Sequence, residues 1–500
     1  MTDQVFDVVL VGGGIVSATL ASLIQRAEPS WTVKIFERLD QVTAEATDGW
    51  HNSGTGHAAL CELNYTPADA NGNINISKAV KIHQQFLTSC EYWASLVSEG
   101  ALGAPESFIN STPHMSYVQG DDDVAFLAAR HRAMTEHHFF ADIEFSDEPN
   151  LIGQWAPLLI EGRDLALPMA ATYAVEGTDV DFGSLTRQLF ADVVERGAQV
   201  ELETEVIGLT RQSDGGWQVI TRNVKTGVEV ETLAKTVLLG AGGWTLKLLR
   251  SARDQQGRPA VPEVRGYGLL PISGKFLKSE NPEVVAQHQV KVYGQAPIGA
   301  PPMSVPHLDA RVIDGKRSVL FGPFAGAIPR FLTNGTNWDF VQGLKPDNLW
   351  PLVTMGVANL NLLGFLLRDL TASKSSKIDQ LRDFLPLVDE ADWDDLVAGQ
   401  RAQIVKPASN GHGELQFGTE VITSNEGTLA GVLGASPGAS TAVSIALDVL
   451  QRCFPERYGI WQKNALNAYL PSLGRDLAND AEATAVVKGR VRKVLRLRAE

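Results

Sequence analysis

A glycine-rich turn near the start of the chain has the residue types that bind the phosphates of a dinucleotide. Gly12, Gly13 and Gly14 follow a short apolar run, and the small Ser17 takes the last position of a G-x-G-x-x-G/A pattern. Glycines let the backbone approach a pyrophosphate, and the N-terminus of the following helix attracts its charge. Glu37, roughly twenty residues further on, is placed to accept hydrogen bonds from a ribose. These residues predict a dinucleotide-binding site.

Three features favour FAD over NAD as that dinucleotide, although both use this turn. The turn lies close to the N-terminus, no second G-x-G-x-x-G is present for a nicotinamide nucleotide, and later glycine-rich segments, 240–243 and 434–441, could supply extra contacts. The second segment precedes an apolar helix, whose N–H groups and positive end would face the negative charge of a reduced flavin. Alternatively, Pro437 and Gly438 only begin that helix.

The elements that must position these residues alternate between strands and helices. Residues 5–11 read as a buried strand, 15–26 as a helix and 32–36 as a second strand, and such a crossover implies a parallel sheet. Strands are also predicted at 198–210, 217–222 and 236–239. A last segment of the same dinucleotide-binding character lies at 431–450.

Two segments of different composition, 86–190 and 260–400, lie between these dinucleotide-binding segments and are richer in aromatic residues and proline. We interpret them as a substrate or cap domain inserted into a discontinuous dinucleotide-binding domain formed by 1–85, 191–259 and 401–460, with a helical tail at 461–500. The notably apolar stretch 348–370 is interrupted by proline, glycine and asparagine. It is predicted to be a buried helical segment.

Composition excludes several classes of protein. The formal net charge of −15 repels nucleic acid as a whole, so no nucleic-acid partner is expected. The cysteines, Cys61, Cys90 and Cys453, lack the spacing of a disulfide framework, a thiol pair or a zinc cluster, and we expect them to be buried and no metal to be bound. No uninterrupted apolar run of about 18 residues and no secretion signal are present, which predicts a cytoplasmic protein.

Longer segments of the chain show a resemblance to a known family. The segment WHNSGTGHAALCELNYTP at 50–67 resembles the signature segment of the malate:quinone oxidoreductases. Segments 300–311 (APPMSVPHLDAR), 319–325 (VLFGPFA) and 413–420 (GELQFGTE) are also similar to that family. Looser versions of three of these blocks occur in the related L-2-hydroxyglutarate dehydrogenases, which makes that group the natural competitor.

The resemblance implies an α/β flavoprotein with a Rossmann-like FAD-binding domain, discontinuous in sequence, and an inserted, mostly β substrate domain. It implies oxidation of (S)-malate to oxaloacetate through FAD, with electrons passed to a membrane quinone and peripheral association with the inner face of the cell membrane. Two alternatives stay open: an FAD-dependent dehydrogenase or oxidase of another 2-hydroxy or 2-amino acid, and a flavin-binding regulatory protein without turnover.

The residues expected to bind FAD lie in the turns described above, in the signature segment and at strand ends. They are Gly12, Gly14, Ser17, Glu37, Arg38, Gly54, Thr55, Gly56, Val206, Gly240, Gly242, Ser436, Gly438, Ala439 and Ser440.

Oxidation of a 2-hydroxy acid needs a base for the hydroxyl proton and cations for the carboxylates, and histidine and arginine suit these tasks. His57 follows the Gly54-Thr55-Gly56 turn and is either the base or a hydrogen-bonding partner of the flavin. His307 and Arg311 share one face if their segment is a strand, which predicts a base beside a carboxylate clamp. Alternatively, they are a structural histidine and a surface ion-pair partner. Weaker candidates for substrate binding are Lys291, Lys406 and His412.

The C-terminal tail combines basic residues with valine and leucine at helical spacing. Lys488, Arg490, Arg492 and Lys493 alternate with apolar residues such as Val487. Such a pattern predicts an amphipathic basic helix that could dock on an anionic membrane. Alternatively, the helix packs on the protein itself with its charges solvated.

Overall fold

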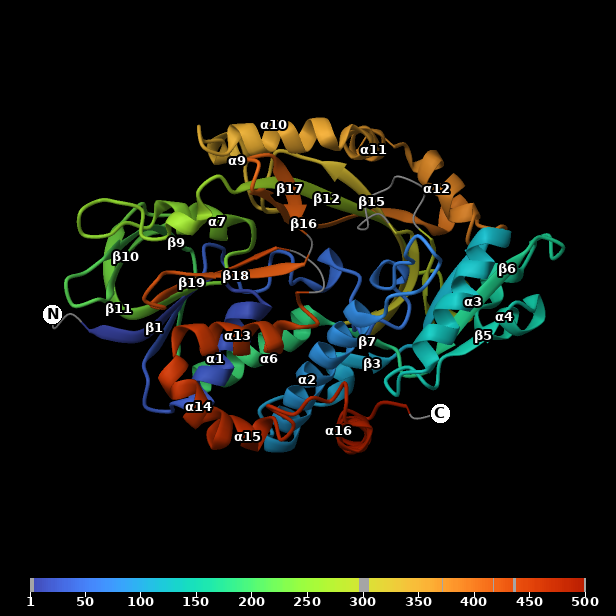
Figure 1. The fold of residues 1–500 in the computed structure, drawn as a ribbon, viewed down its shortest axis with the longest axis horizontal. Coiled ribbons are helices and arrows are strands. Elements are labelled where there is room, and N and C mark those ends of the chain that lie inside the picture. Colours follow the sequence, from blue (N-terminus) through green and yellow to red (C-terminus); the bar gives the residue numbers. More distant parts are fainter. Residues whose placement is uncertain (1–3, 296–304, 371, 417, 435–437, 499–500) are drawn as a thin grey trace.

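The structure is a computed structural model that describes residues 4–295, 305–370, 372–416, 418–434 and 438–498. Two large sheets lie side by side, with helices around them (Figure 1). The predicted α/β class, with a discontinuous Rossmann-like domain beside a second, mostly β domain, is confirmed.

The first sheet has eight strands, and five of them run parallel in the order β19-β11-β1-β2-β8. Their bounds are β1 (Val5–Val11), β2 (Val33–Phe36), β8 (Gln199–Glu201), β11 (Glu229–Leu239) and β19 (Leu429–Gly434); the antiparallel additions are β9 (Thr204–Arg211), β10 (Trp217–Asn223) and β18 (Thr419–Thr423). Alternate residues of β1 point into different cores: Val8 and Leu10 pack on one face, and Val9 and Val11 on the other.

Helices cover both faces of this sheet. On the first face lie α1 (Ile15–Ala27), α2 (Ser77–Glu99), α6 (Phe182–Glu195) and α13 (Ala442–Cys453), and the other face carries α7 (Thr245–Ser251). Helix α1 was predicted correctly to within a residue. Both α2 and α6 pack in the core around α1, so they belong with the first sheet.

The second sheet has nine strands in the order β17-β16-β12-β15-β14-β13-β4-β6-β5, antiparallel except for the β13–β4 pair. Their bounds are β4 (His114–Gln119), β5 (Glu144–Ser146), β6 (Met169–Ala174), β12 (Gly268–Ser279), β13 (Lys291–Tyr293), β14 (His307–Ile313), β15 (Lys316–Ala327), β16 (Asp394–Pro407) and β17 (Gly413–Gln416). A small separate sheet pairs β3 (Ile109–Ser111) with β7 (Thr178–Val180).

The helices around the second sheet are mostly short. They are α3 (Asp121–Thr135), α4 (Pro149–Trp155), α5 (Pro157–Ile160), α8 (Pro282–Gln287), α9 (Asp339–Gly343), α10 (Leu349–Ala358), α11 (Leu360–Leu370) and α12 (Lys374–Arg382). In the described part of the chain, no single helix is long and apolar enough to cross a membrane. Helix α10 and the segment Leu360–Leu366 of α11 reach that length and apolar composition only together, and they are bent by 86° relative to each other.

Four predicted domain boundaries fall inside an element. The boundary at 85/86 lies in α2, the one at 190/191 in α6, the one at 400/401 in β16 and the one at 460/461 in α14 (Pro455–Lys463). The changes of composition that marked these points therefore do not coincide with loops.

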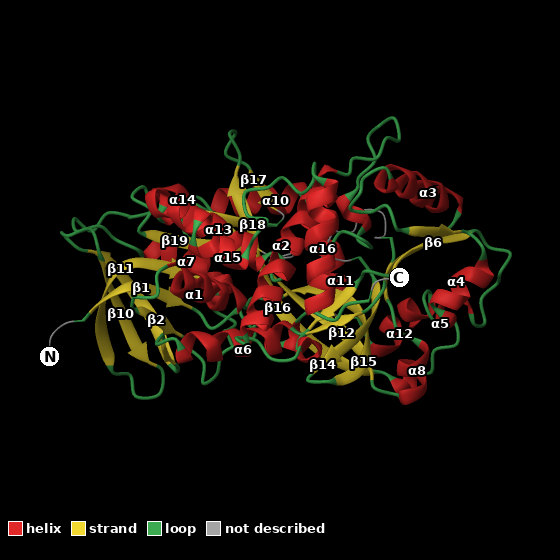
Figure 2. Cartoon of the chain, turned by 90° about the horizontal axis from the view of Figure 1, so that it is seen from below, coloured by secondary structure: helices red, strands yellow, loops and turns green. Residues whose placement is uncertain are grey.

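The C-terminal segment folds back over the first domain as α14 (Pro455–Lys463), α15 (Ala465–Tyr469) and α16 (Ala481–Val494), and α16 lies along α2 (Figure 2). The basic helix is therefore present as predicted. Its apolar residues Val487, Val491 and Leu495 are buried in the protein. The three cysteines are free and buried, as expected.

Candidate active site

The glycine-rich turn lies where the carboxyl ends of β1, β2 and β11 meet. Gly12 has a φ of +107°, and a Cβ there would lie 2.5 Å from the carbonyl oxygen of Gly240. Gly14 caps helix α1 without any side-chain hydrogen bond, and the first turn carries no acidic residue. The first turn of α1 thus contributes no acidic side chain of its own, and Gly12 allows the end of strand β11 to approach the turn closely. This arrangement suits a pyrophosphate.

Glu37 stands at the end of β2 with its carboxylate held by backbone donors. Oε2 accepts from the Gly13 N–H at 2.5 Å, and Oε1 accepts from the Leu39 N–H at 2.7 Å. Burial raises the pKa of this carboxyl, which the two backbone hydrogen bonds partly offset. The group is fixed beside the turn with lone pairs left for ribose hydroxyls.

Other predicted FAD-binding residues lie around the same edge of the sheet. A Cβ on Gly240 would lie 2.5 Å from Ser17 Oγ, so the strand end and α1 need small residues at both positions. Arg38 donates to the Asn334 carbonyl at 2.9 Å, and Val206 is buried in β9. Sequence reasoning missed Thr47, whose Oγ1 accepts from Ile15 N–H at 3.2 Å in the first turn of α1; no local pattern marks it.

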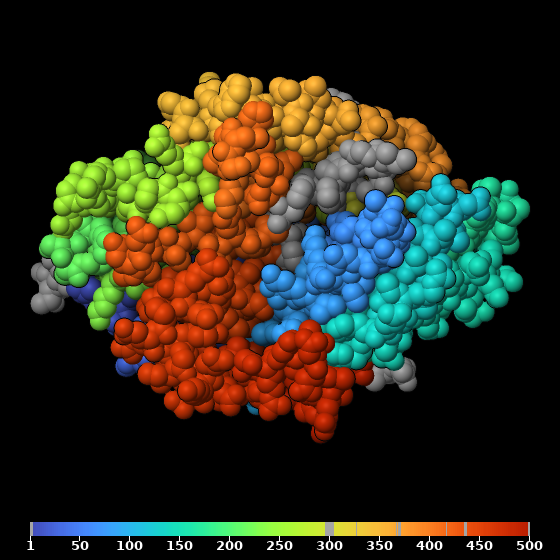
Figure 3. Space-filling model, viewed as in Figure 1, coloured from blue at the N-terminus to red at the C-terminus, as the bar shows by residue number. Residues whose placement is uncertain are grey.

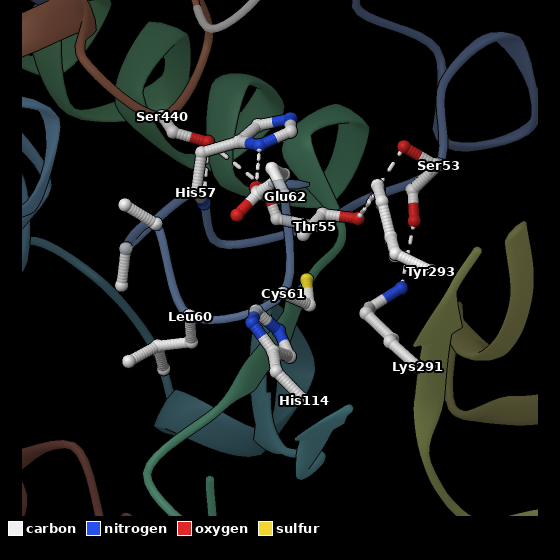
Figure 4. Close-up of polar contacts among 12 residues, drawn as sticks. Ser53, Thr55, His57, Leu60, Cys61, Glu62, His114, Lys291, Tyr293 and Ser440 are labelled. Atoms are coloured by element: carbon white, nitrogen blue, oxygen red, sulfur yellow. Dashed lines mark hydrogen bonds and ion pairs between the residues drawn. The ribbon is translucent and has the colours of Figure 1, made fainter. Parts of the chain in front are cut away.

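The turn from Gly54 to His57 is tied to the start of α13 and to the second sheet (Figure 4). Ser440 Oγ donates to the Thr55 carbonyl at 3.0 Å and accepts from the His57 N–H at 3.2 Å. Thr55 Oγ1 lies 2.8 Å from Tyr293 Oη. Segments far apart in sequence therefore meet at this turn. Gly438 and Ala439 precede α13 here, and Ser436 lies outside the described residues.

His57 makes an ion pair with the buried carboxylate of Glu62 through Nδ1. Burial alone would raise the pKa of Glu62, but the charge and hydrogen bond of His57 outweigh it and lower the pKa to about 2. A carboxylate on one ring nitrogen orients the imidazole. Sequence reasoning missed Glu62 in this role, although it lies only five residues from His57.

His307 and Asp309 form a second histidine–carboxylate pair, on β14. His307 Nδ1 lies 2.7 Å from Asp309 Oδ2, and the imidazole stacks on the Tyr293 ring at 4.5 Å. Burial acts to raise the pKa of Asp309, but the charges of His307 and Lys291 lower it to about 2. The predicted strand with 307 and 309 on one face is confirmed by this contact.

Arg311 does not provide the free clamp that the sequence suggested. Its Nε lies 2.8 Å from Oδ1 of the fully buried Asp179, and Nη1 donates to the carbonyl of Asn52. Lys291 Nζ binds the same Oδ1 at 2.9 Å and donates to the Ser53 carbonyl at 2.8 Å. Asp179 also accepts from the Val312 N–H at 2.7 Å. Both cations are committed to holding the 52–54 turn, and Gly54 leaves room for the guanidinium.

The other cation predicted to bind substrate, Lys406, and the imidazole of His412 also lie elsewhere. Lys406 Nζ pairs with Glu420 Oε1 at 2.7 Å. His412 is exposed on the turn after β16, where its ring meets Trp350 edge to face at 6.2 Å. Among the described residues, no contact links either side chain to the two histidine–carboxylate pairs.

Arg401, on β16, was missed and has the properties of a substrate-binding cation. Within the described part of the chain its guanidinium makes no hydrogen bond or ion pair, although burial lowers its pKa. The phenols of Tyr65 and Tyr293 raise that pKa in part, so Arg401 lies within electrostatic reach of Tyr293, on which His307 stacks. A half-buried, unpaired guanidinium is costly unless an anion binds to it.

The residues present fit FAD. The space at Gly12 would be filled by any Cβ, the first turn of α1 contains no acidic residue, and Glu37 lies beside the turn as a ribose acceptor. The turn that leads into α13 meets the Gly54–His57 turn at a second place, as a long dinucleotide requires. Among the described residues, no cluster of three His, Cys, Asp or Glu could hold a metal ion.

The two-sheet fold and this site define a dinucleotide-binding oxidoreductase. Solved structures of similar fold include the L-α-glycerophosphate oxidase of Mycoplasma pneumoniae with FAD bound (TM-score 0.57, 13% identity, covering 90% of this chain and 95% of that one). Glycine oxidase from Geobacillus kaustophilus is similar to the same degree (TM-score 0.57, 16% identity, 90% and 94% covered). At these identities the likeness shows the fold.

Sequence comparison identifies the family. The family model for malate:quinone oxidoreductase (Mqo) matches residues 4–497. A probable malate:quinone oxidoreductase of Leifsonia xyli is 46% identical over 497 residues, 99% of this chain and 100% of the relative; that of Micrococcus luteus is 48% identical over 474 residues, 95% and 94%. This chain belongs to the malate:quinone oxidoreductase family, as the resemblance of its signature segment implied.

Proposed function

We propose that this protein oxidises (S)-malate to oxaloacetate with FAD and passes the electrons to a quinone. The observation that carries the proposal is the meeting, at the flavin-facing turn, of two histidine–carboxylate pairs with one unpaired arginine. Flavin, when bound, accepts the hydride from C2 of the hydroxy acid. The protein's own residues must take the hydroxyl proton and hold the carboxylates.

His307 is the proposed base. Asp309 stays ionised and holds Nδ1, so Nε2 is the nitrogen that can take the malate hydroxyl proton. Stacking on Tyr293 fixes the plane of the ring. His57 is assigned the other role, a hydrogen-bonding partner of the flavin, because its backbone N–H is bound to Ser440 and its ring is bound to Glu62.

Arg401 is proposed to bind a malate carboxylate, in place of Arg311. A guanidinium presents parallel N–H groups that match a carboxylate, and low-dielectric surroundings strengthen the pair. Lys291 and Arg311 act indirectly: with Asp179 they hold the 52–54 turn against the second sheet.

Anaerobic titration tests this function. Purified protein is mixed with malate, L-2-hydroxyglutarate, lactate or glycerol 3-phosphate, and loss of the flavin absorbance is followed before reoxidation by a soluble quinone. Malate should reduce the flavin fastest, and quinone should restore the spectrum. Faster reduction by another 2-hydroxy acid would assign the protein to the alternative dehydrogenases, and no reduction by any acid would favour a non-catalytic flavin protein.

Peripheral association with the inner face of the cell membrane is part of the proposal, because a long-chain quinone dissolves in lipid. The tail predicted to provide it is engaged with the protein. Lys488 Nζ lies 2.9 Å from Glu176, Arg492 pairs with the same carboxylate, and Arg496 pairs with Glu106 at 2.9 Å. With its apolar side buried as well, α16 offers lipid little, so another surface is required.

A further inference from the structure

Helices α9 and α10 and the start of α11 carry an exposed row of large apolar side chains. Trp338 is 67% exposed, Trp350 61% and Val357 65%. This apolar ridge consists of Trp338, Val341, Leu349, Trp350, Val353, Val357 and Leu360. In α10 its members recur three or four residues apart, so they share one side of the helix. The prediction that 348–370 would be buried is therefore wrong for the outer side.

The opposite side of the same helices is packed on the second sheet. Met355 of α10 and Leu362 and Leu366 of α11 lie in a core with Ile272 and Val405. Figure 3 shows α10 and α11 as a continuous band along the upper edge of the molecule, and Figure 1 places α16 on the opposite side. Because the inner side is anchored, the pair lies flat against the protein and presents only the ridge outward.

Charge around the ridge suits a bilayer surface. Residues 349–367 include no charged side chain, and exposed Lys345 and Arg368 stand before and after them. Of the acids that precede the ridge, Asp339 is buried and Asp347 pairs with Arg250 at 2.5 Å. In a chain of net charge −15, this face therefore has an uncharged centre, flanked by Lys345 on one side and by the adjacent Arg368 and Asp369 on the other, while exposed tryptophans favour the boundary between lipid and water.

We propose that the apolar ridge is the surface by which the protein docks on the lipid bilayer. This inference rests on the proposed use of a lipid-dissolved quinone. Ile272 is the cross-strand partner of Arg401, and such partners share a sheet face. The core under the ridge contains Ile272, so the ridge covers the sheet face that carries the proposed substrate arginine.

The test introduces a negative charge in the ridge and, as a control, the same charge at exposed apolar residues outside the ridge. Val353→Glu and Val357→Glu alter ridge residues that contact solvent, whereas Val486→Glu on α16 and Ile460→Glu on α14 alter equally exposed residues outside it. Each holoenzyme is co-sedimented with vesicles of phosphatidylethanolamine and phosphatidylglycerol. Malate oxidation is measured with a water-soluble dye and with a long-chain quinone in the same vesicles.

Each ridge variant should lose at least about tenfold in vesicle partitioning, since burying one valine is worth about that factor. Quinone activity in vesicles should fall in parallel, with dye activity and flavin content unchanged; the two control variants should match the wild type. Wild-type protein that does not sediment, ridge variants that bind normally, or an equal loss in Val486→Glu would overturn the proposal. If the wild type is a dimer that the ridge variants dissociate, and vesicle binding stays intact, the ridge would be assigned to self-association instead. Failure of malate to reduce the dye with wild type would instead refute the proposed function.

Discussion

Replacing Arg401 by methionine removes the one half-buried guanidinium without a protein partner among the described residues of the site. Methionine keeps much of the length and apolar volume of the side chain but has no N–H donor. If Arg401 binds a malate carboxylate, the substrate loses a two-pronged, charge-assisted contact while the protein loses no contact of its own.

The expected loss follows from the strength of such contacts. A hydrogen bond to a charged group contributes about 1.5–3 kcal/mol, so two bonds from one fork should give roughly 3–6 kcal/mol. At about 1.4 kcal/mol per factor of ten, kcat/KM for malate should fall by about 10² to 10⁴. Most of the change should appear in KM, with a smaller fall in kcat from poorer alignment of C2.

Replacing Arg401 should not lower the stability of the protein, whereas replacing a structural residue would. Removing an unpaired, half-buried cation relieves part of a desolvation cost, so the melting temperature of Arg401→Met should equal or exceed that of the wild type. FAD content should be unchanged. Lys406→Met is the matched control, because Lys406 lies on the same strand but pairs with Glu420; it should keep a normal KM.

The assay is steady-state malate oxidation with a soluble dye, together with thermal unfolding and flavin content. Added guanidinium ion should restore part of the activity of an Arg401→Ala variant. A malate KM within about twofold of wild type in Arg401→Met, or a marked loss of melting temperature with normal kinetics, would refute the assignment.

Four further predictions concern other parts of the site. His307→Asn should lower kcat about 10²-fold or more at normal flavin content, and a small change in stopped-flow flavin reduction would contradict its role as base. Asp309→Asn should lower the free energy of unfolding; because the pKa of Asp309 is lowered to about 2, the difference from wild type should be full above about pH 4 and vanish as pH falls through 2, as urea unfolding would show. Gly12→Ala should abolish FAD binding, since its Cβ would lie 2.5 Å from Gly240 O, and yellow purified protein would disprove the fit. Asp179→Asn should cost about 3–5 kcal/mol of stability because it leaves two buried cations without their carboxylate, and an unchanged denaturation midpoint would show the cluster to be dispensable.

Some residues of the site could be located from sequence because their signal is local. The turn from Gly12 to Ser17 and Glu37 at the next strand end define one strand–helix–strand unit, and the structure brings them to one edge of the sheet. His307 and Asp309 are two apart on a strand, so their shared face followed from the period of two.

Arg311 and Arg401 show where such reasoning stops. Both are arginines on strands of the second sheet, and nothing in their neighbours along the chain distinguishes them. Asp179, from the distant strand β7, neutralises Arg311, whereas no described carboxylate reaches Arg401. Which cation is free for a substrate is decided by packing between distant segments.

The sequence by itself determined the dinucleotide-binding half, the discontinuous two-domain plan and the family, because these depend on short periodic patterns and on long matched segments. It also predicted a basic C-terminal helix and an apolar helical stretch at 348–370. Only the tertiary structure decided which apolar surface stays uncovered. An amphipathic pattern states that a helix has an apolar side, but not whether protein or lipid will cover it: α16 buries that side against α2, while α10 anchors one side on the second sheet and leaves Trp350 and Val357 in solvent.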